Sequence, residues 1–103
     1  MQSTNNGGNE MNQKAVMVTT SHRGVFFGYL QKEDSDTVIL TNARMAVYWS
    51  ADIKGVLGLA SKGPSKSCRI GPQVPEIKLF SVTSIAFVPP SAAKKWEDAP
   101  WEI

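Results

Sequence analysis

The sequence predicts an α+β protein with a small antiparallel β-sheet of about five strands, one central helix and a short C-terminal helix, in the order β-β-β-α-β-β. Three observations lead to this fold class. Short runs of β-branched and aromatic residues recur along the chain, and turn-forming residues separate them. One stretch near the middle has apolar residues at helical spacing. The length of 103 residues suits a single domain.

The first two strands are expected at residues 15–20 and 25–30, because both runs are β-prone and flank the turn Ser21-His22-Arg23-Gly24. They therefore form a predicted hairpin. Gly28 interrupts the second run, which indicates a bulge or a close backbone approach.

The third run, residues 37–49, is long for one strand, since strands usually last about five or six residues. We therefore expect a bulge or bend near Asn42-Ala43. A straight strand would alternate its side chains between two faces. The apolar face would carry Ile39, Ala43, Met45, Val47 and Trp49, and the opposite face Asn42, Arg44, Ala46 and Tyr48. An amide, a guanidinium and a phenol in one row are typical of a binding surface.

The central helix is expected to begin at Ile53, with Asp52 as its N-cap, and to end at Gly63-Pro64. Its predicted buried stripe is Ile53, Val56, Leu57 and Ala60. Gly55 and Gly58 each cost a helix roughly 1 kcal/mol relative to Ala. We therefore expect another backbone, in this chain or in a second subunit, to pack against them.

After the helix, the sequence predicts a short extended piece at residues 68–70 and strands at 76–80 and 82–88. Ser91 is the predicted cap of a last helix over residues 92–97, and Trp96 and Trp101 are expected to fold back onto the body. The chain then divides into a disordered tail at residues 1–13, an α+β domain at 14–90 and a helical tail at 91–103.

Few residues suited to catalysis are present. His22 and Cys68 are the only histidine and cysteine, so the chain cannot form an internal disulfide or a zinc site of usual composition. No carboxylate pair suggests acid-base chemistry, and we expect no enzyme activity and no cofactor. Gly58 and Gly63 have the spacing of a Walker A loop, but Pro64 stands where that motif requires Lys.

Charge and hydropathy restrict the partners. The formal net charge is +2, which is low for tight binding to a nucleic-acid backbone. Residues 41–78 nevertheless contain six basic and two acidic side chains, which favours a phosphate-bearing ligand. No apolar run approaches the roughly 20 residues that a membrane span requires, and the single cysteine suits a cytoplasmic location.

The predicted ligand site centres on the third strand. Arg44 and Arg69 would pair with phosphate, and Tyr48 or Trp49 would stack on a base. Asn42 would read a polar edge, and Lys66 lies on a loop that could close over the ligand. Trp49 could instead belong to the core, which would leave Tyr48 alone to stack.

Several segments together resemble a family of short phage and prophage proteins of unknown function. The resemblance covers about residues 15–90. It rests on Gly24-Val25-Phe26-Phe27-Gly28-Tyr29-Leu30, on Leu40-Thr41-Asn42-Ala43-Arg44 leading into Tyr48-Trp49, on a Leu/Ala-rich helix ending at Gly63, on Cys68-Arg69 and on the strand Val74-Pro75-Glu76-Ile77-Lys78-Leu79.

This resemblance implies a phage protein acting in the cytoplasm of an infected bacterial host. By analogy with phage nucleotide sponges, we expect a homo-oligomer that sequesters a nucleotide immune signal, of the cyclic oligonucleotide or cyclic ADP-ribose type, without cleaving it. Two alternatives remain: a single-stranded nucleic-acid-binding protein, and a phage accessory protein that binds a host protein through Val25-Phe26-Phe27 and the Trp-bearing tail.

Overall fold

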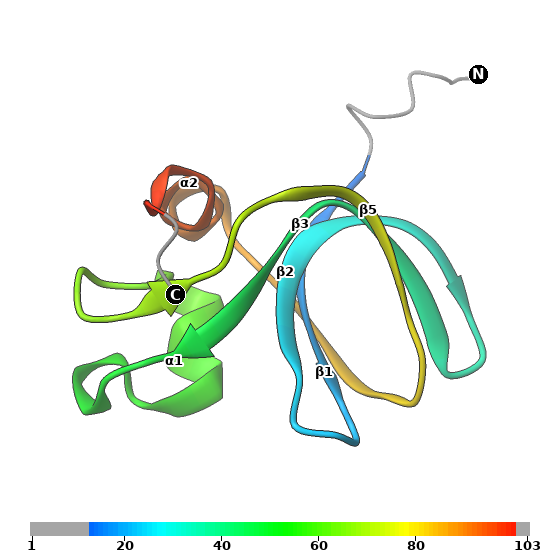
Figure 1. Cartoon of the computed structure of the whole chain (residues 1–103), viewed down its shortest axis with the longest axis horizontal. Helices are drawn as coiled ribbons and strands as arrows, with labels where there is room; N and C mark the ends of the chain where they lie inside the picture. The colour runs from blue at the N-terminus through cyan, green and yellow to red at the C-terminus, as the bar shows by residue number, and fades with distance from the viewer. Residues whose placement is uncertain (1–12, 101–103) are drawn as a thin grey trace.

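The computed structural model describes residues 13–100 and confirms the α+β fold class: an antiparallel sheet with a central helix and a short C-terminal helix (Figure 1). The sheet has six strands within these residues. The strands are β1 (Ala15–Thr20), β2 (Val25–Asp34), β3 (Thr37–Tyr48), β4 (Arg69–Ile70), β5 (Val74–Leu79) and β6 (Val82–Phe87). The helices are a 3-10 turn, η2 (Ala51–Ile53), then α1 (Gly55–Lys62) and α2 (Pro90–Asp98).

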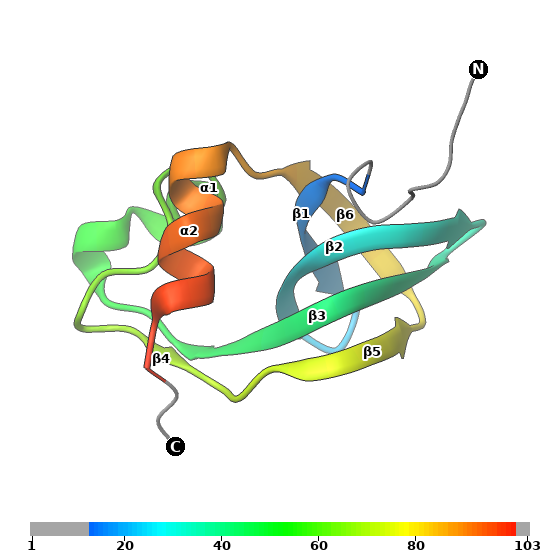
Figure 2. The ribbon, with the colours of Figure 1, turned by 90° about the horizontal axis from the view of Figure 1, so that it is seen from above.

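The sheet has the order β4-β3-β2-β1-β6, and β5 also pairs with β3. β3 is long enough to serve two partners on one edge: its first part pairs with β5, and its end pairs with β4. The first strand, β1, pairs with the last, β6. The strands curve strongly, with both helices on one side of the curved sheet (Figures 1 and 2).

A bulge lies at Asn42-Ala43, as the strand length predicts. The register with β2 shifts there, and Asn42 has a positive φ of 49°. Gly28 faces this region, and a Cβ on it would lie 2.9 Å from the Cβ of Leu40 and 3.2 Å from the carbonyl oxygen of Thr41, so the predicted close backbone approach is confirmed.

The bulge changes which β3 side chains face inward. Arg44 and Ala46 are buried after it, whereas Met45 and Val47 are exposed. The two faces predicted for a straight strand are therefore wrong across the bulge, because one extra residue reverses the alternation. Ala43 is buried in the core that contains Val38 and Leu40, not on one face with Ile39, and the predicted apolar residues Met45 and Val47 lie outside the core.

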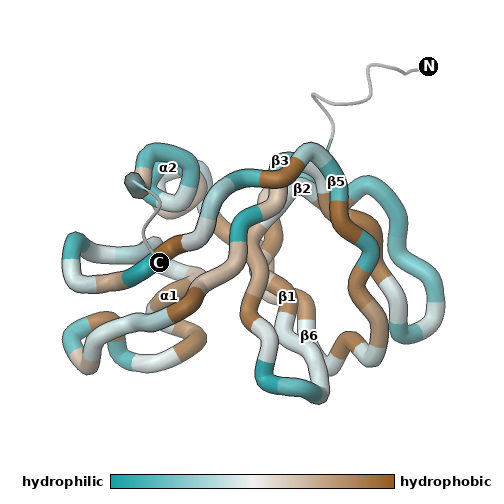
Figure 3. Tube along the Cα trace, viewed as in Figure 1, coloured by the Kyte–Doolittle hydropathy of each residue, from teal (hydrophilic) through white to brown (hydrophobic). Residues whose placement is uncertain are grey.

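The curved sheet is buried on both faces. β1 shows this most clearly: Met17 belongs to a core between the sheet and the helices, and Val16 and Val18 to a second core inside the curve. Hydrophobic residues concentrate along the strands, whereas the turn between β2 and β3 is hydrophilic (Figure 3). The helix-side core includes Phe27, Ala46, Leu59, Ile70, Val88, Ala92 and Trp96. The inner core includes Val38, Leu40, Ala43 and Leu79.

The central helix begins later than predicted. Asp52 lies in η2 and is not an N-cap; α1 begins at Gly55, after Lys54 takes a left-handed conformation with φ 70°. That turn resets the helical phase, so Leu57 is 76% exposed and Leu59 is buried in its place. The helix ends at Lys62 before Gly63, as predicted.

Of the two helix glycines, Gly58 has the close backbone neighbour that the sequence predicts, whereas a Cβ on Gly55 would meet nothing within 4 Å. A Cβ on Gly58 would lie 1.7 Å from the carbonyl oxygen of Ile53. The neighbour is therefore the η2 turn of the same chain.

The C-terminal helix is part of the core. Trp96 is fully buried and stacks on Phe27, with ring centroids 5.1 Å apart and planes at 7°. The prediction that Trp96 folds back is confirmed, but Pro89, not Ser91, is the N-cap of α2. Trp101 and residues 1–12 of the tail predicted at residues 1–13 lie outside the described residues.

Candidate functional site

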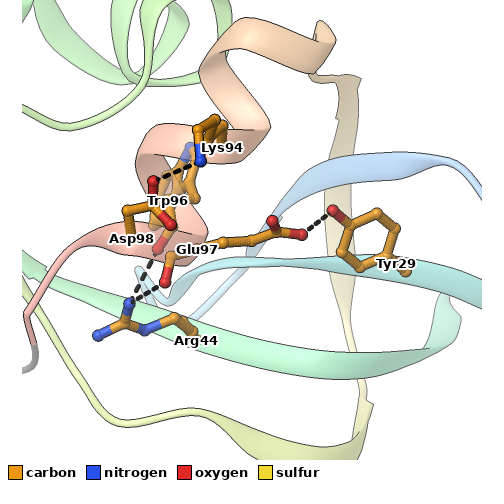
Figure 4. Close-up of polar contacts among 6 residues, drawn as sticks. All are labelled: Tyr29, Arg44, Lys94, Trp96, Glu97 and Asp98. Carbon is orange, nitrogen blue, oxygen red and sulfur yellow. Dashed lines mark hydrogen bonds and ion pairs between the residues drawn. The ribbon is translucent and has the colours of Figure 1, made fainter.

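Arg44 lies on β3 directly after the bulge and is only 5% exposed. Its Nε donates to the carbonyl of Gly71 at 2.8 Å, and its Nη1 donates to the carbonyls of Trp96 at 2.9 Å and Glu97 at 3.3 Å (Figure 4). Burial lowers the pKa of the Arg44 guanidinium from its ordinary value. Arg44 thus joins the sheet to the C-terminal end of α2, and this geometry does not support the expected contact with phosphate.

The other five predicted site residues are distributed over the molecule. Tyr48 and Arg69 are cross-strand neighbours on β3 and β4, and both are exposed. Trp49 is half-buried against the helix-side core, in accord with the core alternative. Asn42 and Lys66 line two separate pockets. The structure therefore brings Tyr48 and Arg69 together but does not form one site from all six.

A different pair of side chains, Tyr29 and Glu97, lines two surface pockets at once. The hydroxyl of Tyr29, on β2, donates a hydrogen bond to the carboxylate of Glu97, on α2 (Figure 4). Both residues line two adjoining pockets of about 520 and 620 Å³. We call these two pockets together the Tyr29–Glu97 groove.

The smaller pocket of this groove, the apolar pocket, has an aromatic ring and two ammonium groups. Phe87 is 64% exposed, and the Nζ of Lys14 lies 5.4 Å from the centroid of its ring. Lys94 lines the same pocket from α2. Its apolar lining comes from Ala15, Val88, Pro90 and Ala93. Such a pocket can hold a planar group that carries negative charge at its edge.

The larger pocket, the polar pocket, is lined by amides and hydroxyls. Its further residues are Gln13, Gln31, Thr41, Asn42 and Pro75. The Thr41 hydroxyl donates to the Gln13 amide oxygen at 2.7 Å. Amide side chains both donate and accept, so this pocket can bind groups that carry hydroxyls or ring nitrogens.

The Tyr29 phenol remains protonated over the physiological pH range. Burial, the hydrogen bond to Glu97 and the negative charge of that carboxylate, in decreasing order of effect, together raise its pKa to about 12. Tyr29 is therefore a fixed donor that orients Glu97. The carboxylate keeps acceptor capacity for ligand hydroxyls.

Within residues 13–100, no group of three or more His, Cys, Asp or Glu side chains could hold a metal ion. His22 is exposed in the turn after β1, and Cys68 is half-buried with its sulfur 3.7 Å from the Ser65 hydroxyl. Neither helix of the described chain is long and apolar enough to cross a membrane.

Sequence reasoning missed Lys14, Tyr29, Phe87 and Glu97. They lie far apart along the chain and meet only because β1 pairs with β6 and α2 packs across the sheet. The one available signal was that Lys14 precedes the first strand and Phe87 ends the last. Antiparallel pairing of those strands places the two residues at the same end.

The fold and the groove define a small α+β domain with composite surface pockets. A family model described as "Domain of unknown function (DUF6948)" matches residues 13–96, and the chain belongs to this family. The matched region contains every strand, α1 and most of α2. Comparisons with curated proteins and with solved structures gave no match.

Proposed function

We propose that this protein binds a small phosphate-bearing nucleotide in the Tyr29–Glu97 groove and does not cleave it. The observation that carries the proposal is the apolar pocket, whose lining combines the exposed Phe87 ring, which has the Lys14 Nζ 5.4 Å from its centroid, with Lys94 and the Glu97 carboxylate. A nucleotide has the matching parts: a planar base, a sugar with hydroxyls and an anionic phosphate.

Each part of such a ligand has a partner in the groove. The base packs against Phe87, and base–aromatic stacking contributes about 1–3 kcal/mol. The phosphate lies near the ammonium groups of Lys14 and Lys94, where charged hydrogen bonds contribute about 1.5–3 kcal/mol each. The sugar hydroxyls donate to Glu97, and the amides of the polar pocket, among them Asn42, bind the remaining polar edge.

The biological side of the proposal rests on the sequence resemblance to short phage and prophage proteins. In the proposed role, the protein is a phage-encoded homo-oligomer that sequesters a nucleotide immune signal in the cytoplasm of its bacterial host. Capture without cleavage agrees with the groove, where the Tyr29 phenol is protonated and its hydroxyl is held in a hydrogen bond to the Glu97 carboxylate.

The test is isothermal titration calorimetry of the purified protein with mononucleotides, cyclic dinucleotides and cyclic ADP-ribose. At least one of these is expected to bind, and Phe87→Ala and Lys14→Ala are each expected to weaken that binding about tenfold or more. Phe80→Ala is a matched control, because Phe80 is 61% exposed and also lies under a lysine, Lys78, at 5.4 Å, but it lines neither pocket of the groove.

Three outcomes would contradict the proposal. One is that no probe binds. Another is that Phe80→Ala weakens binding as much as Phe87→Ala does. The third is recovery of degraded ligand, by chromatography, after the complex is heated; an enzyme would give that result. Stronger binding of a single-stranded oligonucleotide, with a steep salt dependence, would favour nucleic-acid binding instead.

A further inference from the structure

A third pocket, of about 430 Å³, lies between α2 and the loop that follows α1. We call it the lysine pocket, because Lys66, Lys94 and Lys95 line it. Apolar residues form another part of its wall, and two hydroxyls lie among them. These residues are Pro64, Ala99 and Pro100, with Ser65 and Ser91. It therefore repeats the combination found in the apolar pocket: an apolar surface with lysines around it.

The lysine pocket has an excess of positive charge. Asp98 is the one carboxylate in its lining, and it pairs with Lys94 at 3.0 Å. Lys66 and Lys95 have no carboxylate within ion-pair distance among residues 13–100. Both are exposed, so their ammonium groups are accessible to an anionic ligand.

The two pockets lie on adjoining faces of α2 and share one residue. Pro90, Ala93 and Glu97 line the apolar pocket, and Ser91, Lys95 and Asp98 line the lysine pocket. Lys94 lines both. A helix with its side chains is only about 10–12 Å across, so one ligand can reach from one face to the next over Lys94.

We infer that the ligand has two nucleotide units joined by a phosphodiester. This inference rests on the proposed function and names its ligand class. One base occupies the apolar pocket against Phe87, and the second occupies the lysine pocket. The linking phosphate lies at Lys94, and Lys66 and Lys95 hold the second unit. A mononucleotide fills only the first pocket.

The experiment compares one-unit and two-unit probes by calorimetry: the four common 5′-mononucleotides, their 5′-phosphorylated linear homodinucleotides, and cyclic di-AMP and cyclic di-GMP. The variant is Lys66→Ala/Lys95→Ala. It is expected to weaken dinucleotide binding about tenfold or more, since each lysine supplies a charged contact. Mononucleotide binding should change less than about twofold. The control is Lys62→Ala/Lys78→Ala, which removes the same charge from exposed lysines outside all three pockets.

The outcomes separate this inference from the proposed function. The inference is overturned if mononucleotides and dinucleotides bind equally well, or if the Lys66/Lys95 variant affects both alike. The proposed function survives that result as long as Phe87→Ala still weakens binding. If no probe binds at all, both fail. An equal effect of the Lys62/Lys78 control would show that net charge alone governs binding, and would also overturn the inference.

Discussion

At the scale of single residues, Arg44 shows how burial redirects a charged side chain. The sequence predicted that Arg44 pairs with the phosphate of a ligand, whereas the structure shows it bonded within the protein. Its partners are main-chain carbonyls 27 and 52 residues away, at Gly71 and Trp96. Every residue type has a main-chain carbonyl, so no sequence motif could predict these partners. A guanidinium, with five donors in a fixed plane, suits several carbonyls at a helix end.

Replacing Arg44 is therefore expected to weaken the fold. Arg44→Ala leaves buried carbonyls unsatisfied and should lower the free energy of unfolding by about 3 kcal/mol. Urea unfolding followed by tryptophan fluorescence measures this change. Arg69→Ala removes an exposed arginine from the neighbouring strand β4 and should change stability by less than about 0.5 kcal/mol. Equal unfolding midpoints for the two variants would contradict a structural role for Arg44.

At the scale of elements, strand positions were more predictable than the helix start. The length of the third run correctly predicted the bulge at Asn42-Ala43, because a long strand must bend to stay on a small sheet. The start of α1 depends on a left-handed Lys54, and lysine has no intrinsic preference for that conformation. Tertiary packing of η2 selects the left-handed conformation of Lys54. Local sequence does not contain that information, and it therefore predicted a helix start with Asp52 as the N-cap.

Gly58 gives a prediction for this element. In an open helix, Gly→Ala stabilises by about 1 kcal/mol. Here the new Cβ would lie 1.7 Å from the Ile53 carbonyl oxygen, and α1 or η2 must shift. Gly58→Ala is expected to lower the free energy of unfolding by about 1–3 kcal/mol, measured by thermal unfolding in circular dichroism.

The control for Gly58→Ala is Leu57→Ala, the adjacent position on the exposed face of α1. It should change stability by less than about 0.5 kcal/mol. A higher Tm for Gly58→Ala would mean that the close approach to η2 does not constrain the helix.

At the scale of the whole molecule, one curved sheet separates two hydrophobic cores. The sequence predicted an antiparallel sheet and the succession of its main strands along the chain, but not their order in the sheet, and it placed residues 91–103 in a tail. Trp96 indicated that this segment folds back onto the body, but the sequence does not show which strands the helix packs against. The candidate groove escaped prediction for the same reason: Glu97 enters it only after α2 docks.

Docking of α2 is tested at Trp96. Trp96→Ala removes a fully buried ring from its stack on Phe27, and should lower the free energy of unfolding by about 3–5 kcal/mol. Chemical denaturation monitored by circular dichroism measures the loss. Trp49→Ala, at a half-buried position, should cost clearly less. A Trp96→Ala protein as stable as the wild type would show that packing of α2 does not contribute to the stability of the domain.

The pairing of β1 with β6 also matters while the chain is being made. The Thr19 hydroxyl meets the Thr83 hydroxyl at 2.7 Å across 64 residues of sequence. A ribosome adding about 5–20 residues per second needs roughly 3–13 s to produce that partner strand. During this interval β2 covers one edge of β1, and the other edge stays open. The nascent sheet is therefore complete only when β6, the last strand in the chain, has been synthesised.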